Sequence, residues 1–522
     1  MKRPSWTRRR WAGGTLLLLM MGGCGASEAT GSDIGTPAPP PPPPPPTPVT
    51  ALCTTPNRPH GVQFGANVNA LFWEQHYGDD RLLSAVRSLG RPVVRLPGGT
   101  EADYFDWELG RPVDACRYGG CRTWDSAQLT PPALFQRFGA FRSSTAGGFV
   151  NFARQVDGTL LLVTNTVTAS VDDNVRWVNA ALAAGAALPL IELSNEPYFG
   201  RVEGTDNTER LYPTAASHVA YVRRLATALR PRVPNARFGF PMFVPRMDPA
   251  TGQPAVGHDA RMLTWNEQSL AAGIANDVDA FALHFYPRLP GRRSAGDAEY
   301  LRQLATFAPS YWALTVQQPQ WAALPAGKRL WITELNASFA DAPELVGSWM
   351  HGLMQAQLML LMLQDARVEV VLQHMLTGNA QWQAVVHPGR TPDIVPAPGF
   401  TPYARTATGD ALAVLSNTLR GATCVQALPA GALPAATPGV VGVVARDASG
   451  ARALLANATA DSVSLDLRAL GFASATVTQQ TAAPLSRPGA GTTVASSPLR
   501  PGADGRTVRV GPHALVSVVA VP

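Results

Sequence analysis

A regular alternation of short apolar runs and longer helical stretches between residues 62 and 419 constrains the fold of this chain more than any other feature. Each apolar run is long enough for a strand, and each interval leaves room for a helix. The predicted strands are residues 62–68, 92–96, 160–166, 188–193, 237–243, 280–286, 330–335 and 368–375. The predicted helices are residues 81–89, 145–155, 171–184, 215–229, 261–272, 298–308, 346–363 and 405–419.

Strand–helix units in this order predict a (β/α)8 TIM barrel, an α/β fold whose parallel strands close into a cylinder inside a ring of helices. The alternative is a doubly wound open sheet. Such a sheet would normally carry a Gly-rich phosphate loop after its first strand, and Gly65-Ala66-Asn67-Val68-Asn69 is not one. The barrel is therefore preferred, and its chemistry is expected at the carboxyl ends of the strands.

Two predicted strands end in carboxylates for which a buried strand has no structural use. The fourth strand runs into Ser194-Asn195-Glu196 and stops at Pro197, and the seventh ends near Glu334. Two carboxylates roughly 5 Å apart are what a retaining glycosidase needs, because one protonates the leaving oxygen while the other attacks the anomeric carbon.

Side chains alternate between the two faces of a strand, so the pattern also assigns faces. It places Glu192, Ser194 and Glu196 on one side of the fourth strand, Ala282, His284 and Tyr286 on one side of the sixth, and Ile332 and Glu334 on one side of the seventh. If these sides face the barrel interior, four polar groups converge on one mouth: Glu196, Glu334, His284 and Tyr286.

These residues carry a resemblance to a known clan. Asn195-Glu196-Pro197 after the fourth strand, His284-Phe285-Tyr286 at the sixth and Glu334 at the seventh resemble the retaining (β/α)8 glycoside hydrolases of clan A. The resemblance implies that Glu196 is the acid/base and that Glu334 is the nucleophile.

Two segments of the chain resemble particular families within the clan. Residues 94–100, with Tyr104 and Trp107, resemble the second-strand region of α-L-arabinofuranosidases. Residues 192–197 resemble the heparanase and β-glucuronidase family. This chain has Ser194 where those families commonly have glycine.

Further side chains are candidates for substrate binding. Asn195 is a neutral donor placed to hold a sugar 2-hydroxyl, and His284 could position either carboxylate or the sugar. Tyr286 and Arg95 are candidates to orient Glu334 as the nucleophile, although Arg95 could equally be a structural partner of Glu192. Sugar rings present apolar faces on which Trp107 and Trp382 could stack, and packing is the alternative for both.

The predicted function is a retaining glycoside hydrolase that acts on the O-glycosyl bonds of oligo- or polysaccharides, with a carbohydrate substrate, no cofactor and no metal. The alternative is a catalytically inactive, surface glycan-binding lipoprotein, which predicts that Glu196 and Glu334 lie too far apart for chemistry. A structural lipoprotein of the envelope would need no convergent polar mouth.

Residues 1–24 have the features of a lipoprotein signal peptide: a basic start, a short apolar run and small residues before Cys24. Met21-Gly22-Gly23-Cys24 resembles a bacterial lipoprotein cleavage box, which would make Cys24 the lipidated first residue. An ordinary secretory signal with an incidental cysteine is the alternative. Residues 25–50 form a Pro-rich linker, in which the run 39–46 favours extended polyproline II. We therefore expect an exported protein, anchored at the bacterial cell envelope through lipid alone or secreted.

The formal net charge of +6 does not indicate a nucleic-acid partner. Five basic residues and no acidic residue precede Cys24, so removal of this segment lowers the charge to about +1. These residues are Lys2, Arg3, Arg8, Arg9 and Arg10. A nearly neutral mature chain has no electrostatic reason to bind a polyanion.

Four cysteines follow the signal, an even number that favours disulfides in an oxidising compartment. Cys116 and Cys121 close a small Gly-containing loop and are paired first, which leaves Cys53 with Cys424. A zinc site is the competing idea, but no closely spaced histidine pair accompanies the cysteines.

A change of pattern ends the predicted barrel, residues 51–420. Residues 421–522 contain short alternating strands separated by Gly, Pro and Ser turns, which predict a small β-sandwich that packs on the barrel. Its expected strands are residues 440–445, 453–457, 463–467, 474–479, 507–510 and 515–521.

Overall fold

The structure is a computed structural model of the 522-residue chain. It describes residues 53, 55–68, 78–112, 146–200, 207–248, 251–255, 257–289, 297–337, 342–378, 382–387, 399–434 and 437–521. The lipidation candidate Cys24 and the proposed pair Cys116 and Cys121 lie outside these residues.

Eight parallel strands form the centre of the larger domain. They are β1 Gln63–Asn67, β2 Val93–Leu96, β5 Thr159–Val163, β6 Leu190–Glu192, β7 Arg237–Met242, β8 Ala280–Phe285, β9 Arg329–Leu335 and β10 Val368–His374. The strands close into a barrel in the order β1-β10-β9-β8-β7-β6-β5-β2. The TIM-barrel prediction is therefore confirmed, and each strand lies within two or three residues of its predicted bounds.

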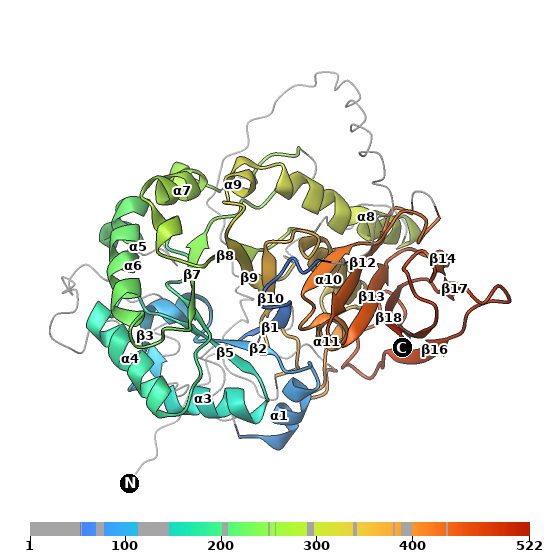
Figure 1. Ribbon diagram of the computed structural model, residues 1–522, viewed down its shortest axis with the longest axis horizontal. Coiled ribbons are helices and arrows are strands. Elements are labelled where there is room, and N and C mark those ends of the chain that lie inside the picture. Colours follow the sequence, from blue (N-terminus) through green and yellow to red (C-terminus); the bar gives the residue numbers. More distant parts are fainter. Residues whose placement is uncertain are drawn as a thin grey trace, which may run out of the picture.

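Helices surround the barrel on its outer side (Figure 1). They are α1 Asp80–Arg87, α3 Ala146–Gln155, α4 Val171–Ala183, α5 Asn207–Leu211, α6 Ala215–Leu229, α7 Ala260–Ala271, α8 Asp297–Val316, α9 Pro319–Ala322, α10 Trp349–Met362 and α11 Ala407–Leu419, with 3-10 helices η2 Gly99–Tyr104, η3 Ile274–Asn276 and η4 Pro343–Leu345. A short hairpin, β3 Phe105–Asp106 with β4 Arg111–Pro112, follows η2.

Many of these helices begin where the sequence supplies a capping side chain. The side chains of Ser170, Thr214, Asp259, Ser348 and Thr406 each accept a hydrogen bond from the backbone N–H three residues ahead. Each such cap stabilises a helix start by about 1 kcal/mol, so the helix boundaries are encoded locally.

Apolar side chains fill the interior of the barrel. The cluster comprises Val93, Ala102, Leu161, Val163, Leu190, Ala280, Trp331, Val370 and Leu372. Trp331 occupies space that Gly239 leaves open, because a Cβ on Gly239 would lie only 2.6 Å from the indole ring. The interior below the strand ends is therefore a packed core.

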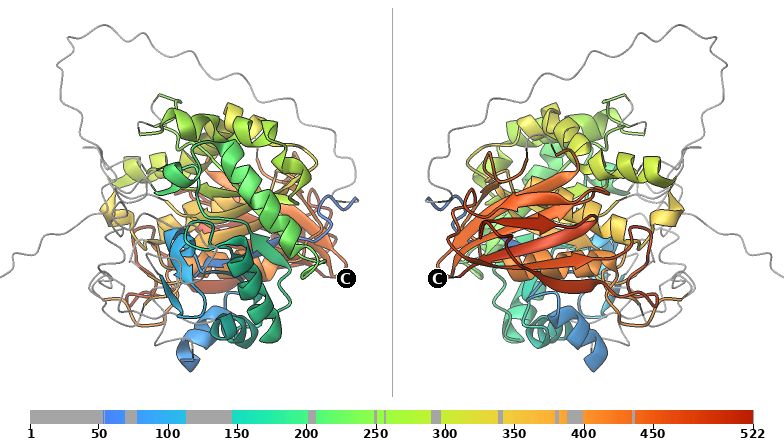
Figure 2. Two further views of the ribbon diagram at one scale, coloured as in Figure 1. Left: turned by 90° about the vertical axis from the view of Figure 1, so that its left-hand side faces the viewer. Right: turned by 90° about the vertical axis from the view of Figure 1, so that its right-hand side faces the viewer.

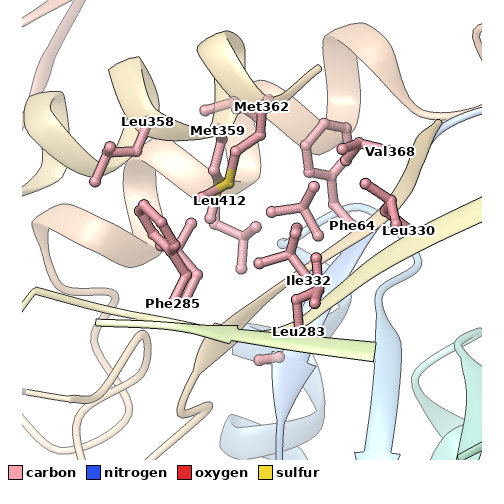
Figure 3. Packing of buried hydrophobic residues seen from close by; sticks show 14 of the residues in the cluster. Phe64, Leu283, Phe285, Leu330, Ile332, Leu358, Met359, Met362, Val368 and Leu412 are labelled. Atoms are coloured by element: carbon pink, nitrogen blue, oxygen red, sulfur yellow. The ribbon is translucent and has the colours of Figure 1, made fainter. Parts of the chain in front are cut away.

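The outer faces of the strands pack against the helices. Figure 3 shows Leu283, Leu330 and Ile332 of the barrel facing Leu358, Met359 and Met362 of α10. All residues of α10 except Leu361 are buried, because the helix is covered on its other side by the C-terminal domain.

Strand β9 contains one extra residue relative to both neighbours. Leu283 and Val371 both pair with Ile332, but His284 pairs with Glu334 and Gln373 pairs with Leu335. This β-bulge turns both Thr333 and Glu334 inward, while Ile332 lies on the outer face (Figure 3). The expectation that Ile332 and Glu334 share a face is therefore wrong, because strict alternation does not hold through a bulge.

The C-terminal domain is a β-sandwich, as predicted. Its six-stranded sheet has the order β11-β12-β13-β18-β15-β16 and packs across β14 and β17. The strands are β11 Cys424–Ala427, β12 Val440–Asp447, β13 Gly450–Asn457, β14 Val463–Asp466, β15 Ala475–Thr481, β16 Ala495–Leu499, β17 Thr507–Val510 and β18 Ala514–Ala520. Figure 2 shows this broad sheet lying against the barrel.

Specific contacts join the two domains. The indole N–H of Trp349 donates to the carbonyl of His513 at 2.7 Å, and the Gln357 amide donates to the carbonyl of Gly439 at 2.8 Å. Cys53 and Cys424 form the predicted disulfide, which ties the segment before β1 to β11.

In the part of the chain that the structure describes, no helix combines the length and the apolar character that a membrane span requires.

Candidate active site

Two glutamates meet at the carboxyl ends of the barrel strands. Glu196 follows β6, and Glu334 lies in the bulge of β9. A carboxylate oxygen of each, together with a ring nitrogen of His284, forms a group whose atoms all lie within 4.8 Å of one another. The side chain of Glu334 is 4% exposed and that of Glu196 is 19% exposed. Glu334 is thus the enclosed member of the pair, and Glu196 is the one that solvent reaches.

The backbone after β6 turns sharply to present Glu196. Ser194 has a φ of 136° and Glu196 has a φ of 38°, both positive values that favour glycine. Ser194 is held in this conformation by a 2.8 Å hydrogen bond between its hydroxyl and that of Thr166. Backbone strain of this kind costs roughly 1–3 kcal/mol per residue and clusters at functional sites.

Polar groups surround Glu334 on both carboxylate oxygens. Nη1 of Arg95 donates to Oε1 at 2.7 Å, Nδ2 of Asn67 approaches the same oxygen at 3.4 Å, and the hydroxyl of Tyr286 donates to Oε2. Burial alone would raise the pKa of Glu334, but the neighbouring His284, His374 and Arg95 and the Tyr286 hydrogen bond lower it. Glu334 is therefore ionised at neutral pH.

Arg95 contacts both of its candidate partners, Glu334 and Glu192. Besides contacting Glu334, its guanidinium donates from Nε to Oε2 of Glu192 at 2.7 Å and from Nη2 to Oε1 at 3.0 Å. Nη2 also donates to Oδ1 of Asn195 at 2.8 Å. This contact fixes the Asn195 amide with its carbonyl toward Arg95, which leaves the amide N–H groups to other partners.

His284 lies between three carboxylates. Its Nδ1 is 2.7 Å from Glu196 and 3.5 Å from Glu334, and its Nε2 is 3.7 Å from Glu192, too long for a hydrogen bond. Burial opposes the charged form, but Glu334 and Glu196 raise the pKa of His284 to about 10. The imidazolium and Arg95 thus place two positive charges among the carboxyl groups of Glu192, Glu196 and Glu334.

The spacing of Glu196, His284 and Glu334 would also allow a metal ion to be held. Metal ligation requires a neutral imidazole, and a histidine whose pKa is raised to about 10 carries a proton on both nitrogens at neutral pH. The donor set therefore fits an acid–base pair with a bridging cation better than a metal centre.

The two tryptophans proposed as sugar platforms lie in different surroundings. Trp382 is half-buried beside the site, with its ring edge-on to Tyr286 at 5.6 Å and to His374 at 5.7 Å between ring centroids. Trp107 follows β3 and packs on the hydrophobic core. The structure thus brings together Glu196, Glu334, Asn195, His284, Tyr286, Arg95 and Trp382.

Asn67 and His374 belong to the site but were not predicted from the sequence, whereas Tyr198 and Asp103 were considered as possible sugar-binding residues. Asn67 ends β1 and His374 ends β10, so the polar strand ends that marked Glu196 and Glu334 would also have marked them. The hydroxyl of Tyr198 donates to Glu196 at 3.3 Å. Asp103 lies buried nearby, where burial and the charge of Glu196 raise its pKa well above the ordinary value.

A cavity of about 620 Å³ lies at the opposite end of the barrel. Its lining comes from the amino ends of the strands and includes Gln63, Arg237, Ala280, Arg329 and Trp331. The packed interior separates this cavity from the two glutamates.

The fold of this chain, a (β/α)8 barrel followed by a β-sandwich, is similar to that of solved glycoside hydrolases, which it matches over nearly their whole length. An α-L-arabinofuranosidase of family 51 from Bifidobacterium longum matches with a TM-score of 0.60 and 16% identity, covering 90% of this chain and 97% of that chain. An α-L-arabinofuranosidase from Thermotoga maritima matches with a TM-score of 0.54 and 13% identity, over 90% and 97% of the two chains.

A 4-O-α-L-rhamnosyl-β-D-glucuronidase from Fusarium oxysporum matches with a TM-score of 0.54 and 16% identity, covering 90% of this chain and 99% of that chain. At these identities the likeness shows the fold, and the expected similarity to arabinofuranosidases and to a glucuronidase is confirmed at that level. No protein-family model and no curated protein matches the chain.

Proposed function

We propose that this protein is a retaining glycoside hydrolase that cleaves O-glycosyl bonds by double displacement. One observation carries the proposal: oxygen atoms of Glu196 and Glu334 lie no more than 4.8 Å apart. Retaining enzymes hold their two carboxyl groups about 5–5.5 Å apart, whereas inverting enzymes separate them by about 6.5–9.5 Å to admit a water molecule.

The surroundings of the two acids favour one division of roles. Glu334 is buried, ionised and fixed by Arg95 and Tyr286, as a nucleophile must be. Glu196 is more exposed and contacts His284 and Tyr198, so it can exchange protons with a leaving group and with water.

In the first step, an oxygen of Glu334 attacks the anomeric carbon while protonated Glu196 gives its proton to the departing oxygen. The glycosyl–enzyme ester forms as the glycosidic bond breaks. In the second step, Glu196 takes a proton from water, the hydroxyl attacks the anomeric carbon and Glu334 leaves as the carboxylate. Asn195, whose carbonyl is held by Arg95, is placed to donate to the sugar 2-hydroxyl.

The short separation also weighs against an inactive glycan-binding barrel. That alternative requires Glu196 and Glu334 to be too far apart for chemistry, and their spacing of no more than 4.8 Å supports the enzyme instead.

The substrate class is tested with nitrophenyl glycosides. Solved proteins that share this fold are named for α-L-arabinofuranosides and for a rhamnosyl-β-D-glucuronide, so we infer that the substrate belongs among pentosyl or uronosyl glycosides. The panel comprises arabinofuranoside, glucuronide, xyloside and glucoside. NMR of the first-formed product should show the anomeric configuration of the substrate. Hydrolysis with inversion, or none in the panel and in natural polysaccharides, would overturn the proposal.

We also propose that the protein is exported and held at the cell envelope by a lipid on Cys24. The basic start, the short apolar run and Cys24 support this, and the Cys53–Cys424 disulfide is typical of an oxidising compartment. Expressed in a bacterium, the wild type should sediment with membranes, whereas Cys24→Ala should not. A wild type found in the soluble fraction would contradict the anchor.

A further inference from the structure

His374 ends β10 beside the nucleophile, and the mechanism above assigns it no part. We propose that His374 is a further substrate-contacting residue, a neutral imidazole that holds its Nε2–H toward the sugar bound between Glu196 and Glu334. This inference rests on the proposed function and adds a donor to it. The ligand atom it would meet is a hydrogen-bond acceptor of the sugar, either a hydroxyl or the ring oxygen.

The first step fixes the amide of Asn67. Nη1 of Arg95 lies 3.1 Å from one terminal atom of this amide, and a guanidinium can only donate. That atom must therefore be the carbonyl oxygen Oδ1. The NH2 group of Asn67 then faces the other way, toward His374 and Glu334.

The second step fixes the tautomer of His374. Nδ2 of Asn67 lies 2.6 Å from Nδ1 of His374. Two N–H groups cannot face each other at this distance, so Nδ1 must accept the hydrogen bond and carry no proton. The contact between Nδ1 and Glu334 is longer, at 3.4 Å. The imidazole proton is therefore on Nε2.

The third step concerns charge. Burial lowers the pKa of His374 to about 4, with Glu334 opposing this shift and His284 and Arg95 adding to it. These groups face His374 from β9, β8 and β2, together with Tyr286 after β8 and Asn67 of β1. His374 is thus neutral where His284 is charged, although both imidazoles lie beside the same carboxylate.

The fourth step places the Nε2–H. The ring is held edge-on by Tyr286 and by Trp382, each with centroids 5.7 Å away. Its Nδ1 edge is turned inward to Asn67, so Nε2 lies on the edge turned away from that contact. The side chain is 14% exposed, and among the described residues no group hydrogen-bonds to Nε2. The Nε2–H is therefore available to donate a hydrogen bond to a ligand.

Two variants distinguish the effect of the N–H donor of His374 from the effect of its ring. His374→Phe keeps a flat ring between Tyr286 and Trp382 but removes the N–H, whereas His374→Gln restores an amide N–H. On the nitrophenyl glycoside that the wild type cleaves, kcat/KM should fall roughly 10- to 100-fold in His374→Phe. His374→Gln should recover a large part of this loss. Thermal melting checks that both variants fold.

A second measurement does not depend on turnover. Nitrogen-15 NMR, with the His374 signals assigned by difference from the Phe variant, should show the Nε2–H tautomer between pH 5 and pH 8. Its Nε2–H signal should shift when arabinose, glucuronate, xylose or glucose binds. A proton on Nδ1, an imidazolium in this range, or a His374→Phe variant with wild-type kcat/KM would each overturn the inference.

The outcomes for His374 and for the proposed function are distinguishable. If the wild type cleaves a glycoside of the panel and His374→Phe cleaves it equally well, the inference about His374 is overturned but the proposed hydrolase function is retained. If the wild type cleaves no glycoside, the proposed hydrolase function is overturned, and the monosaccharide titration then tests the contact between His374 and the sugar. An Nε2–H signal that does not shift on addition of the sugars contradicts this contact.

Discussion

Arg95 and Glu192 form a two-point ion pair in the interior of the barrel, with side chains that are both 0% exposed. The pair holds the guanidinium so that Nη1 reaches Glu334 and Nη2 reaches Asn195. Burial opposes ionisation of Glu192, but the charge of Arg95 lowers its pKa. Glu192 therefore orients the groups that contact the proposed nucleophile without touching the substrate space itself.

Glu192→Gln should destabilise the protein and reduce its activity. Removal of one partner leaves part of a buried charge uncompensated, which costs about 3–5 kcal/mol of unfolding free energy. Asp277→Asn is the matched control, because Asp277 pairs with Arg223 at the surface and exposed pairs contribute about 1 kcal/mol or less. Urea unfolding measures both variants. Equal costs would show that the buried pair has no special structural role.

Glu334→Ala should abolish turnover, with a loss of at least about 1,000-fold in kcat, because no other group can form the ester. The cavity left by the side chain admits small anions, so azide should partly restore activity and yield a glycosyl azide. Full activity without azide would remove Glu334 from its role.

Glu196→Gln should affect substrates according to their leaving groups. General acid catalysis contributes roughly 10²- to 10⁴-fold, and it matters most when the departing alcohol is a poor leaving group. We expect methyl or nitrobenzyl glycosides to slow far more than dinitrophenyl glycosides. Comparable slowing across the series would argue against proton donation by Glu196.

His284 should make stability depend on pH at alkaline values. Its pKa is raised to about 10 in the folded protein, above the roughly 6.5 of an unfolded histidine. The contribution of its charge is therefore fully present below about pH 6.5 and is lost as the pH rises toward 10. The difference in Tm between the wild type and His284→Gln should shrink over this range. A constant difference would mean that His284 is not charged in the folded state.

The fold was largely predictable, because its signals are local. Runs of apolar residues marked all eight barrel strands, and the intervals between these runs located the helices. Strand β16 was missed because Ala495–Leu499 is almost wholly exposed and contains a proline, which leaves no apolar alternation to detect.

Site residues were predictable where the type and position of a single residue marked them. Features that depend on how several residues or strands are arranged in space were not predictable. Glu196, Glu334, His284 and Tyr286 stand out as polar groups at the ends of buried strands. The bulge at Thr333 depends on the register of β9 against both of its neighbours, and register is a property of three strands together. The two charge states of His284 and His374 depend on which neighbours surround each ring.

Trp331 fills the barrel axis beneath the two glutamates, in the space that Gly239 leaves for it. Packing at this point closes the route along the barrel axis to the cavity at the amino ends of the strands. Water that releases the bound sugar in the second step therefore has to approach the ester from the side of the carboxyl ends of the strands. That is the same side as the carboxyl group of Glu196, which takes the proton from this water.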